Sequence, residues 1–422
     1  MNINTNIQSF SSQSGIKVTQ NGNSNQSIDK NKNSEAVNIN IDSKTLDTLN
    51  LLSSLEEETF IKSYNNFISD ERRAIRNRLE EVYSKATKEN KKFANPEQHI
   101  SDKYYSQASP YYIEGLSRIE RDVAHRHESD YLKYGKLRNI SFIDPNIKDL
   151  NSMNDRVESA EKKAFNRDMV NEQFQQLLNK YGISIPKDSN LRFTIEPYDY
   201  KVSVSGLDDK NLSSLIEDVL NTGDNSEELF RHIQYSRPTY LGTSEQFSED
   251  KSMKYGIFHN VKELTGYDLR ELENVDGKFL TKDGTDVIEL LRIGVMNSKH
   301  ISEEYKGVAF DSYSADLSEV AKKGFENIED LNLSIDYKNG SFHDVGQSET
   351  YGVGKRDWIY ELKASKTQTL GEAFKDYRKD IVYGENSQDI IKEALNLKEF
   401  SFKGIKSEAD SLLEKYGSKD ME

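Results

Sequence analysis

The chain has 422 residues, and its 57 Lys and Arg against 72 Asp and Glu give a formal net charge of −15. That balance argues against a general nucleic-acid binder, which needs a positive surface to displace phosphate counterions, and against electrostatic docking on anionic lipid. The absence of cysteine excludes disulfide scaffolds, thiolate nucleophiles, iron–sulfur clusters and cysteine-bound zinc. At about 100–200 residues per domain, the length predicts two or three domains, or one domain with long extensions.

Residues 1–43 consist mainly of Asn, Ser, Gln and Lys, with few apolar residues among them. Such a composition cannot bury enough apolar area to offset chain entropy, so we predict a disordered polar tail. The start of the chain lacks the basic, apolar and small-residue succession of a cleaved secretory signal, and no window approaches the ~18 consecutive apolar residues of a membrane span. We therefore expect a protein that is cytoplasmic or is exported without a cleaved signal peptide.

Residues 44–182 are predicted to form a helical region. Between about residues 54 and 93, apolar residues recur at spacings of three, four and seven, which predicts one long amphipathic helix. A loop with two prolines follows, and then two more helices are predicted, from about 111 to 134 and from about 154 to 181, each ended by a glycine. The apolar positions of the first predicted helix are Ile61, Tyr64, Ile68, Ile75, Leu79, Val82 and Ala86.

Residues 183–240 are predicted to form a small α/β unit. Apolar and polar residues alternate over 191–195 and again over 202–204, on either side of a Pro-Tyr-Asp turn, which indicates a β-hairpin. Aspartates or an Asn-Ser pair then stand at the N-cap positions of two helices, the first ending near Leu220 and the second near Ile233.

Residues 241–422 are predicted to form a mixed α/β region with C-terminal helices. Its expected elements are a short strand in GKFLT, a helix over 286–295, a hairpin around Asn339-Gly340, a strand over 358–362, and helices beginning near Thr369, Ser387 and Ser407. Together these elements predict an α+β fold with long N-terminal helices, a central β-hairpin plus helices, and a mixed hairpin and helix region at the C-terminus.

The best candidate for a catalytic site combines Asp344 with Glu361 and Lys363. A carboxylate at the end of one strand, followed by Glu-x-Lys on the next, is how metal-dependent nucleases hold Mg²⁺ and position a water molecule. The triplet is common in this composition, because Glu-x-Lys also occurs at Glu89, Glu161 and Glu304. We therefore favour an ordinary pair of strands at this place and keep the metal-dependent hydrolase as an alternative.

Other motifs fail on a required residue. Gly352-Val353-Gly354-Lys355 lacks the first glycine and the final Ser or Thr of a phosphate-binding loop. His125 and His127 point about 200° apart on a helix, so they cannot share a metal ion. No metal or other cofactor is expected.

The central segment resembles a known family. The run KAFNRDMVNEQFQQLLNKYGISIPKDSNLRFTIEPYDYKVSVSG, with DGKFLTKDGTDV further on, is similar to an uncharacterised bacterial family of the domain-of-unknown-function type from Bacillus-like low-GC bacteria. The resemblance covers roughly residues 105–345. No activity is assigned to that family, so the resemblance implies no catalytic residue. Separately, the cysteine-free chain with its polar start is similar in composition to substrates of flagellar-type export.

These observations favour a non-enzymatic bacterial interaction or structural protein, exported or not, that acts through its helical face and polar tail on an unidentified protein partner. Self-association is a further alternative, whereas nucleic acid and a membrane span are not expected. The alternatives are a secreted, toxin-like or crystal-forming protein, which such acidic chains rich in Tyr and Asn can be, and the hydrolase that would use Asp344, Glu361 and Lys363.

Overall fold

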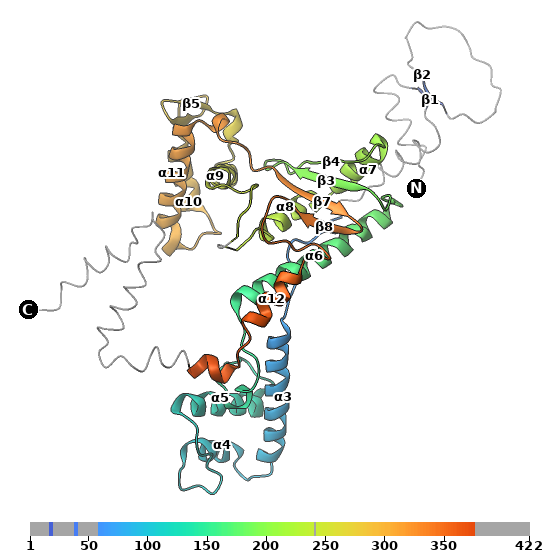
Figure 1. Cartoon of the computed structure of the whole chain (residues 1–422). Coiled ribbons are helices and arrows are strands. Elements are labelled where there is room, and N and C mark those ends of the chain that lie inside the picture. Colours follow the sequence, from blue (N-terminus) through green and yellow to red (C-terminus); the bar gives the residue numbers. More distant parts are fainter. Residues whose placement is uncertain (1–16, 20–37, 41–57, 240–241, 376–422) are drawn as a thin grey trace, which may run out of the picture. The chain divides into compact units, whose positions relative to one another are not determined.

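A computed structural model describes residues 17–19, 38–40, 58–239 and 242–375 (Figure 1). The chain divides into two compact units, each built from separate stretches of sequence. Among the described residues, the sheet unit contains those up to Phe67 together with Glu158–Leu362, and the helical unit contains Ile68–Val157 and residues 363–375. This division differs from the boundaries near residues 182 and 240 that the sequence suggested.

The sheet unit is built on a four-stranded antiparallel sheet in the order β4-β3-β7-β8. Its strands are β3 (Asn190–Ile195), β4 (Val202–Ser205), β7 (Leu333–Lys338) and β8 (Ser341–Asp344). Both hairpins that the sequence predicts are present, and β7 joins them by pairing with β3, from Asn190 opposite Lys338 to Ile195 opposite Leu333. Asn339 and Gly340 both have positive φ angles, of 51° and 78°, as a tight two-residue hairpin turn requires.

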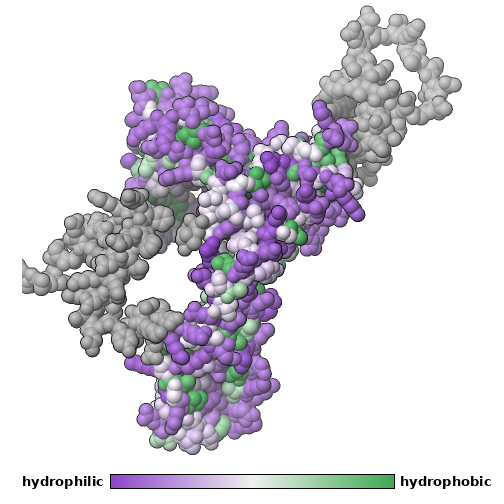
Figure 2. Space-filling model, in the orientation of Figure 1, coloured by the Kyte–Doolittle hydropathy of each residue, from purple (hydrophilic) through white to green (hydrophobic). Residues whose placement is uncertain are grey.

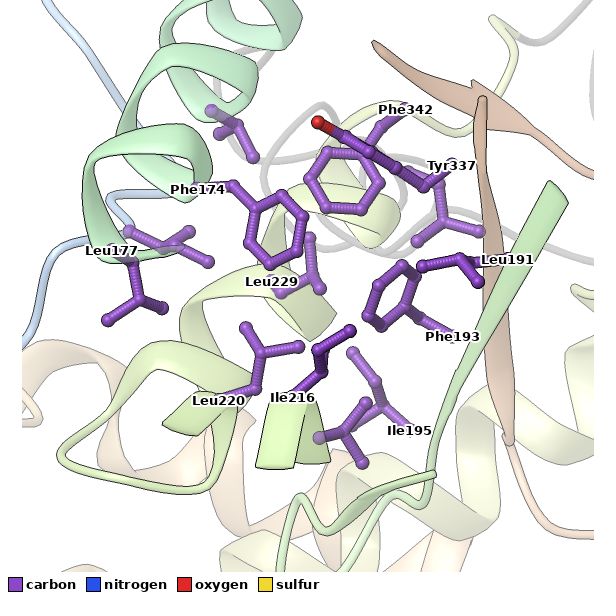
Figure 3. Close-up of a cluster of buried hydrophobic side chains, with 14 of the residues drawn as sticks. Phe174, Leu177, Leu191, Phe193, Ile195, Ile216, Leu220, Leu229, Tyr337 and Phe342 are labelled. Atoms are coloured by element: carbon purple, nitrogen blue, oxygen red, sulfur yellow. The ribbon is translucent and has the colours of Figure 1, made fainter. Parts of the chain in front are cut away.

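The main core of the sheet unit lies between one face of this sheet and three helices (Figure 3). The helices are α6 (Asp155–Lys180), α7 (Lys210–Leu220) and α8 (Asn225–Tyr235). Four aromatic rings from α6 and the sheet meet at its centre, with centroid distances from Phe174 of 5.6 Å to Phe193, 5.1 Å to Tyr337 and 5.0 Å to Phe342. The alternation of apolar residues in β3 and β7 places these side chains on one face of the sheet, which confirms the predicted α+β class.

A second core in the same unit is formed by α9 (Glu249–Thr265), α10 (Val287–Asn297) and α11 (Lys306–Lys323). A small antiparallel pair, β5 (Glu273–Val275) and β6 (Lys278–Leu280), packs beside them. The predicted strand in GKFLT is β6, and the predicted helix over 286–295 is α10. Three single-turn helices connect these elements: η2 (Leu269–Glu271), η3 (Glu303–Tyr305) and η4 (Phe325–Asn327).

The prediction of one helix from about residue 54 is wrong, because the helix α3 begins only at Asp70 and ends at Asn90. Residues 58–67 are instead an extended segment of the sheet unit, which we call the strap. Its Ile61 is fully buried in the main core. The strap is followed by α3, whose N-cap is Ser69: its side chain accepts a hydrogen bond from the amide of Arg72.

The helical unit consists of α3, α4 (Pro96–Tyr105) and α5 (Arg118–Tyr134), with the single turn η1 (Pro145–Ile147). The sequence predicted a loop where α4 forms, although Pro96 stands at its first turn, where proline is tolerated. α5 is as predicted at its C-terminus, ending at Gly135 in a left-handed conformation, but it starts at a capping box between Ser117 and Glu120. Leu370 joins Leu79 and Ile147 in the core of this unit.

The predicted strand over residues 358–362 is also wrong, because Asp357–Ser365 forms the helix α12. Ile359 is the residue of this segment that is buried, whereas Tyr360 is 71% exposed, a distribution that suits one face of a helix. Figure 1 shows α12 beside α6, and in the sheet unit Ile359 and Trp358 pack with Ala160 and Ala164 of α6.

Most of the predicted tail, and the helices predicted near Ser387 and Ser407, lie outside the described residues. Within the tail the structure describes two short strands, β1 (Lys17–Thr19) and β2 (Asn38–Asn40), which pair in parallel. In the described ranges, no helix has both the length and the apolar composition needed to cross a bilayer.

Candidate functional site

Asp344, the first residue of the predicted catalytic set, lies at the end of β8 and is bound to Arg167 of α6. Nη2 of Arg167 donates to Oδ1 of Asp344 at 2.7 Å and Nη1 donates to Oδ2 at 3.2 Å. The backbone amide of Tyr351 donates to the same Oδ2 at 2.7 Å. The side chains of Arg167 and Asp344 are 0% and 3% exposed. The carboxylate is thus neutralised and hydrogen-bonded inside the protein.

The rest of the Arg167 guanidinium is also bound. Its Nη1 donates to the carbonyl of Phe342 at 3.1 Å, and its Nε donates to Nε2 of His232 at 2.8 Å. His232 is fully buried on α8, and burial together with the charge of Arg167 lowers its pKa well below the ordinary value. The imidazole is therefore neutral and serves as a hydrogen-bond acceptor that joins α8 to α6 and β8.

Glu361 and Lys363 lie on α12 rather than on a strand. Glu361 is exposed, and the Lys363 ammonium pairs with Glu71 at 2.9 Å. Within the described ranges, no group of three or more His, Asp or Glu side chains is placed to hold a metal ion. Asp344 and Lys363 thus already have partners of opposite charge, Arg167 and Glu71, and the hydrolase alternative stays a prediction.

The helical unit holds a second buried polar cluster, centred on Asp144. Oδ2 of Asp144 accepts hydrogen bonds from His127 Nδ1 at 2.7 Å and from the Tyr83 hydroxyl at 2.5 Å, and its Oδ1 accepts from the amide of Asn146 at 2.9 Å. Nε2 of His127 accepts from the backbone amide of Ser141 at 3.2 Å. Burial alone would raise the pKa of Asp144, but the hydrogen bonds from His127, Tyr83 and Asn146 hold it below the ordinary value.

Both ring nitrogens of His127 are thus occupied, and the side chains of His127 and Asp144 are 0% exposed. A histidine that acts as a general base must present a free nitrogen to a substrate. The cluster therefore joins α3, α5 and η1 and stabilises the helical unit. The same holds for Glu128, which is fully buried and accepts hydrogen bonds from Asn90 and Tyr104 and pairs with Lys103.

Four exposed apolar residues lie in or next to the loop that joins α4 to α5. We call this group the α4–α5 surface, and it consists of Tyr105, Tyr111, Ile113 and Ile119, which are 48%, 50%, 36% and 51% exposed. In Figure 2, the lower part of the picture, which contains these helices, shows hydrophobic residues among hydrophilic ones.

The loop beneath this surface is held by specific contacts. Nη1 of Arg121 donates to the carbonyl oxygens of Tyr104 and Ile113, at 3.2 and 2.7 Å. The amide of Ile113 donates to the carbonyl of Lys103 at 2.9 Å, and the hydroxyl of Tyr105 donates to Asp122 at 2.9 Å.

Aromatic packing fixes the position of Tyr111. The rings of Phe93 and His99 stack with their centroids 3.6 Å apart, and Tyr111 packs edge-on against both. Burial, with the nearby charge of Lys103, lowers the pKa of His99, which favours its neutral form in this stack.

Sequence reasoning placed Tyr111 and Ile113 inside a helix and did not single them out. The signal that could have found them is the Tyr-Tyr-Ile run directly after Pro110, since a proline followed by a glycine at 115 indicates a loop. The buried clusters carry no comparable sequence signal, because their members are far apart along the chain.

Comparison with known proteins gives a family and one named relative. The chain is 39% identical over 307 residues to the uncharacterized protein YbdO of Bacillus subtilis (strain 168), which covers 73% of this chain and 76% of the relative. No solved structure matches. Residues 18–363 match the family described as a domain of unknown function, DUF4885, which extends the resemblance predicted for roughly 105–345. The chain therefore belongs to the DUF4885 family.

Proposed function

We propose that this chain is an interaction protein that binds a protein partner through the α4–α5 surface. The observation that carries the proposal is that four large apolar side chains, all in or next to the loop that joins α4 to α5, are exposed. Single exposed apolar residues are ordinary, whereas a group of them on one fixed element is typical of an interaction site.

The composition of the surface supports a protein partner. Tyrosine offers a rigid apolar ring with a polar tip and is enriched among the residues that dominate binding energy, as is arginine. Arg121 lies under the surface, with its guanidinium carbon 4.4 Å from the ring centre of Tyr112. Because the loop is already held by Arg121 and by aromatic packing, binding would require little further ordering.

The charge of residues 68–157 also favours a protein partner. Residues 68–157 contain 17 Lys and Arg against 15 Asp and Glu, whereas the whole chain has a net charge of −15. Residues 68–157, which hold the α4–α5 surface, thus have neither the excess of positive charge that nucleic acid requires nor a strong repulsive field. Association through apolar contact fits such a nearly neutral surface, and the partner it suits is a protein with an apolar helix or loop.

A photo-reactive amino acid at position 105 or 119 of the full chain tests this proposal in the bacterium that makes the protein. Irradiation should give a covalent adduct with one protein of defined mass from both positions. The matched control is position 360, because Tyr360 is 71% exposed but lies on α12. An adduct with a second copy of the chain would assign the surface to self-association.

The same experiment is then repeated with Ile113→Ser in the labelled chain. Loss of the adduct is expected, since the substitution removes an apolar side chain at the edge of the surface and leaves the buried clusters intact. If positions 105 and 119 give no adduct, or only those that position 360 gives, the α4–α5 surface is not a binding site.

A further inference from the structure

A pocket of about 450 Å³ in the sheet unit lies between the end of α8, the first turns of α9 and the side of α6. Its apolar walls include Phe247, Tyr255 and Leu331, and two cationic residues, Lys163 and Arg237, also line it. Pockets of roughly 300–1,000 Å³ with apolar walls and a few polar groups are typical sites for small molecules.

The backbone that presents Arg237 is fixed on both sides. Lys163 Nζ donates to the carbonyl of Arg237 at 2.7 Å. Two residues later, the amide and the hydroxyl of Thr239 donate to the Glu349 carboxylate at 3.0 and 2.7 Å. The carbonyl of Ser236, the residue directly before Arg237, accepts a hydrogen bond from the side chain of Gln347 at 3.1 Å. The pocket wall is thus formed before any ligand binds, which lowers the entropic cost of binding.

The two cations differ in how far their charge is compensated. Burial lowers the pKa of Lys163, which disfavours its charged form, although the charge of Glu349 opposes this shift, and Lys163 Nζ is bound to the carbonyl of Arg237. The guanidinium of Arg237 is exposed and has no hydrogen bond or ion pair to any residue in the described ranges. One positive charge therefore faces the pocket without a counter-charge from the described residues.

We propose that this pocket binds a small molecule that carries one carboxylate and an aromatic or apolar body. The planar fork of Arg237 matches a carboxylate, which it can bind through two parallel hydrogen bonds. Phe247 and Tyr255 line the same pocket and supply aromatic surface for the body of the ligand. A single uncompensated charge suits a monoanion, whereas a phosphate dianion would leave one negative charge unpaired beside Glu349. The site goes beyond the proposed protein partner, because it lies in the sheet unit.

Ligand-observed saturation-transfer NMR on the full chain tests the site with three probes of the same ring: benzoate, benzamide and phenyl phosphate. Benzoate should bind with a dissociation constant of about millimolar order, as expected for so small a ligand. Benzamide, which keeps the ring and lacks the charge, should bind roughly tenfold more weakly or not at all.

Two substitutions identify the group responsible. Arg237→Gln should weaken benzoate binding roughly tenfold, because it removes the charged fork from an exposed position without opening the core. Arg192→Gln, which makes the same change of charge at an exposed residue already paired with Asp336, should leave binding unchanged. Equal binding of benzoate and benzamide, tighter binding of phenyl phosphate than of benzoate, or unchanged binding in Arg237→Gln would each overturn the proposal.

Discussion

Arg167 shows how one side chain can organise several elements of this fold. From α6 it reaches Asp344 on β8, His232 on α8 and the carbonyl of Phe342, and its side chain is 0% exposed. A buried ion pair contributes little net stability compared with apolar residues of the same shape, but removing one partner leaves a charge without compensation. The cluster therefore acts as a set of mutually dependent residues, and its members should tolerate single substitutions poorly.

Asp344→Ala should lower the free energy of unfolding of the sheet unit by about 3–5 kcal/mol, because Arg167 stays buried without its carboxylate. The matched control is Asp336→Ala in the same sheet. Arg192 and Asp336 also form a two-point pair, with 2.7 and 3.0 Å between donors and acceptors, but their side chains are 51% and 39% exposed. That change should cost less than about 1 kcal/mol. Urea unfolding followed by the single tryptophan measures both, and equal losses would contradict the role given to Arg167.

The neutral state of His232 leads to a prediction about pH. Its pKa in the folded protein is lowered by burial and by Arg167, whereas in the unfolded chain it titrates near 6.5. Below that pH the unfolded chain binds a proton that the fold excludes, so stability should fall as the pH drops from 7.5 to 5.5, by roughly 1 kcal/mol from this residue. His232→Gln keeps an acceptor for Arg167 and should reduce the pH dependence by that amount.

Other histidines whose pKa is lowered by burial act in the same direction, so part of the pH dependence should remain in this variant. His300→Gln, at an exposed histidine, should change nothing. Urea unfolding at the two pH values provides the measurement. An unchanged pH dependence in His232→Gln would show that the imidazole is protonated in the fold.

For single residues, the sequence indicates which residue types could form a site, but it does not indicate which side chains contact one another in the fold. Asp344 could be selected because it follows a clear hairpin, but Arg167 lies 177 residues before it. No pattern within either segment indicates that the two meet, so a carboxylate bound to arginine could not be told from one that is free to hold a metal ion. The pocket cation Arg237 was not singled out for the same reason, since its surroundings come from α6, α8 and α9.

Among the elements, the strap explains why the first predicted helix was too long. Its apolar residues continue the helical spacing of α3, but its backbone amides are bound by side chains instead of by a helical turn. Asn225 Oδ1 accepts from the amides of Phe60 and Ile61 at 2.7 and 3.0 Å, and Glu228 Oε2 accepts from the amide of Ser63 at 2.7 Å. Periodicity reports which residues are apolar and cannot exclude an extended segment whose partners lie over 160 residues away.

Ile61→Ala should destabilise the sheet unit by about 2–5 kcal/mol, because it opens a cavity at a side chain that is 0% exposed. Tyr64→Ala in the same strap should cost much less, since Tyr64 is 56% exposed. Hydrogen exchange of the amides of residues 60–63 reports on the strap itself and should accelerate in the first variant only. Similar losses in both variants would mean that the strap is not anchored through Ile61.

Elements with strong local signals were predicted well. The two hairpins, α6 and the glycine that ends α5 depend on turn and cap residues that act within a few positions. The segment of α12 shows the limit of such reasoning, because Trp-Ile-Tyr favours a strand by composition, whereas its environment decides the outcome. There Trp358 Nε1 donates to the carbonyl of Thr350 at 2.9 Å, and Ile359 packs against α6.

For the whole molecule, the division into units was the least predictable feature. Each unit combines two separate stretches of the chain, and α6 and α12 contribute residues to both units. The predicted boundary near residue 182 followed a change from helical to strand composition. That change lies inside the sheet unit, whose main core needs the helical residues Phe174 and Leu177 as much as the strands. A composition shift marks a change of element, and it marks a domain boundary only where the core also ends.

Because the buried clusters of the two units share no residue, we expect the amides of each unit to lose their protection from hydrogen exchange independently. Leu79→Ala, in the core of the helical unit, should cost about 2–5 kcal/mol and accelerate hydrogen exchange in α3 and α5 while leaving β3 and β7 unchanged. Leu191→Ala, in the main core of the sheet unit, should accelerate hydrogen exchange in β3 and β7 while leaving α3 and α5 unchanged. Hydrogen exchange of the full chain, resolved by mass spectrometry into peptides from each unit, makes the comparison. If either substitution accelerates exchange equally in both units, the chain unfolds as one cooperative body, because energetic coupling between the units then exceeds the stability of each core.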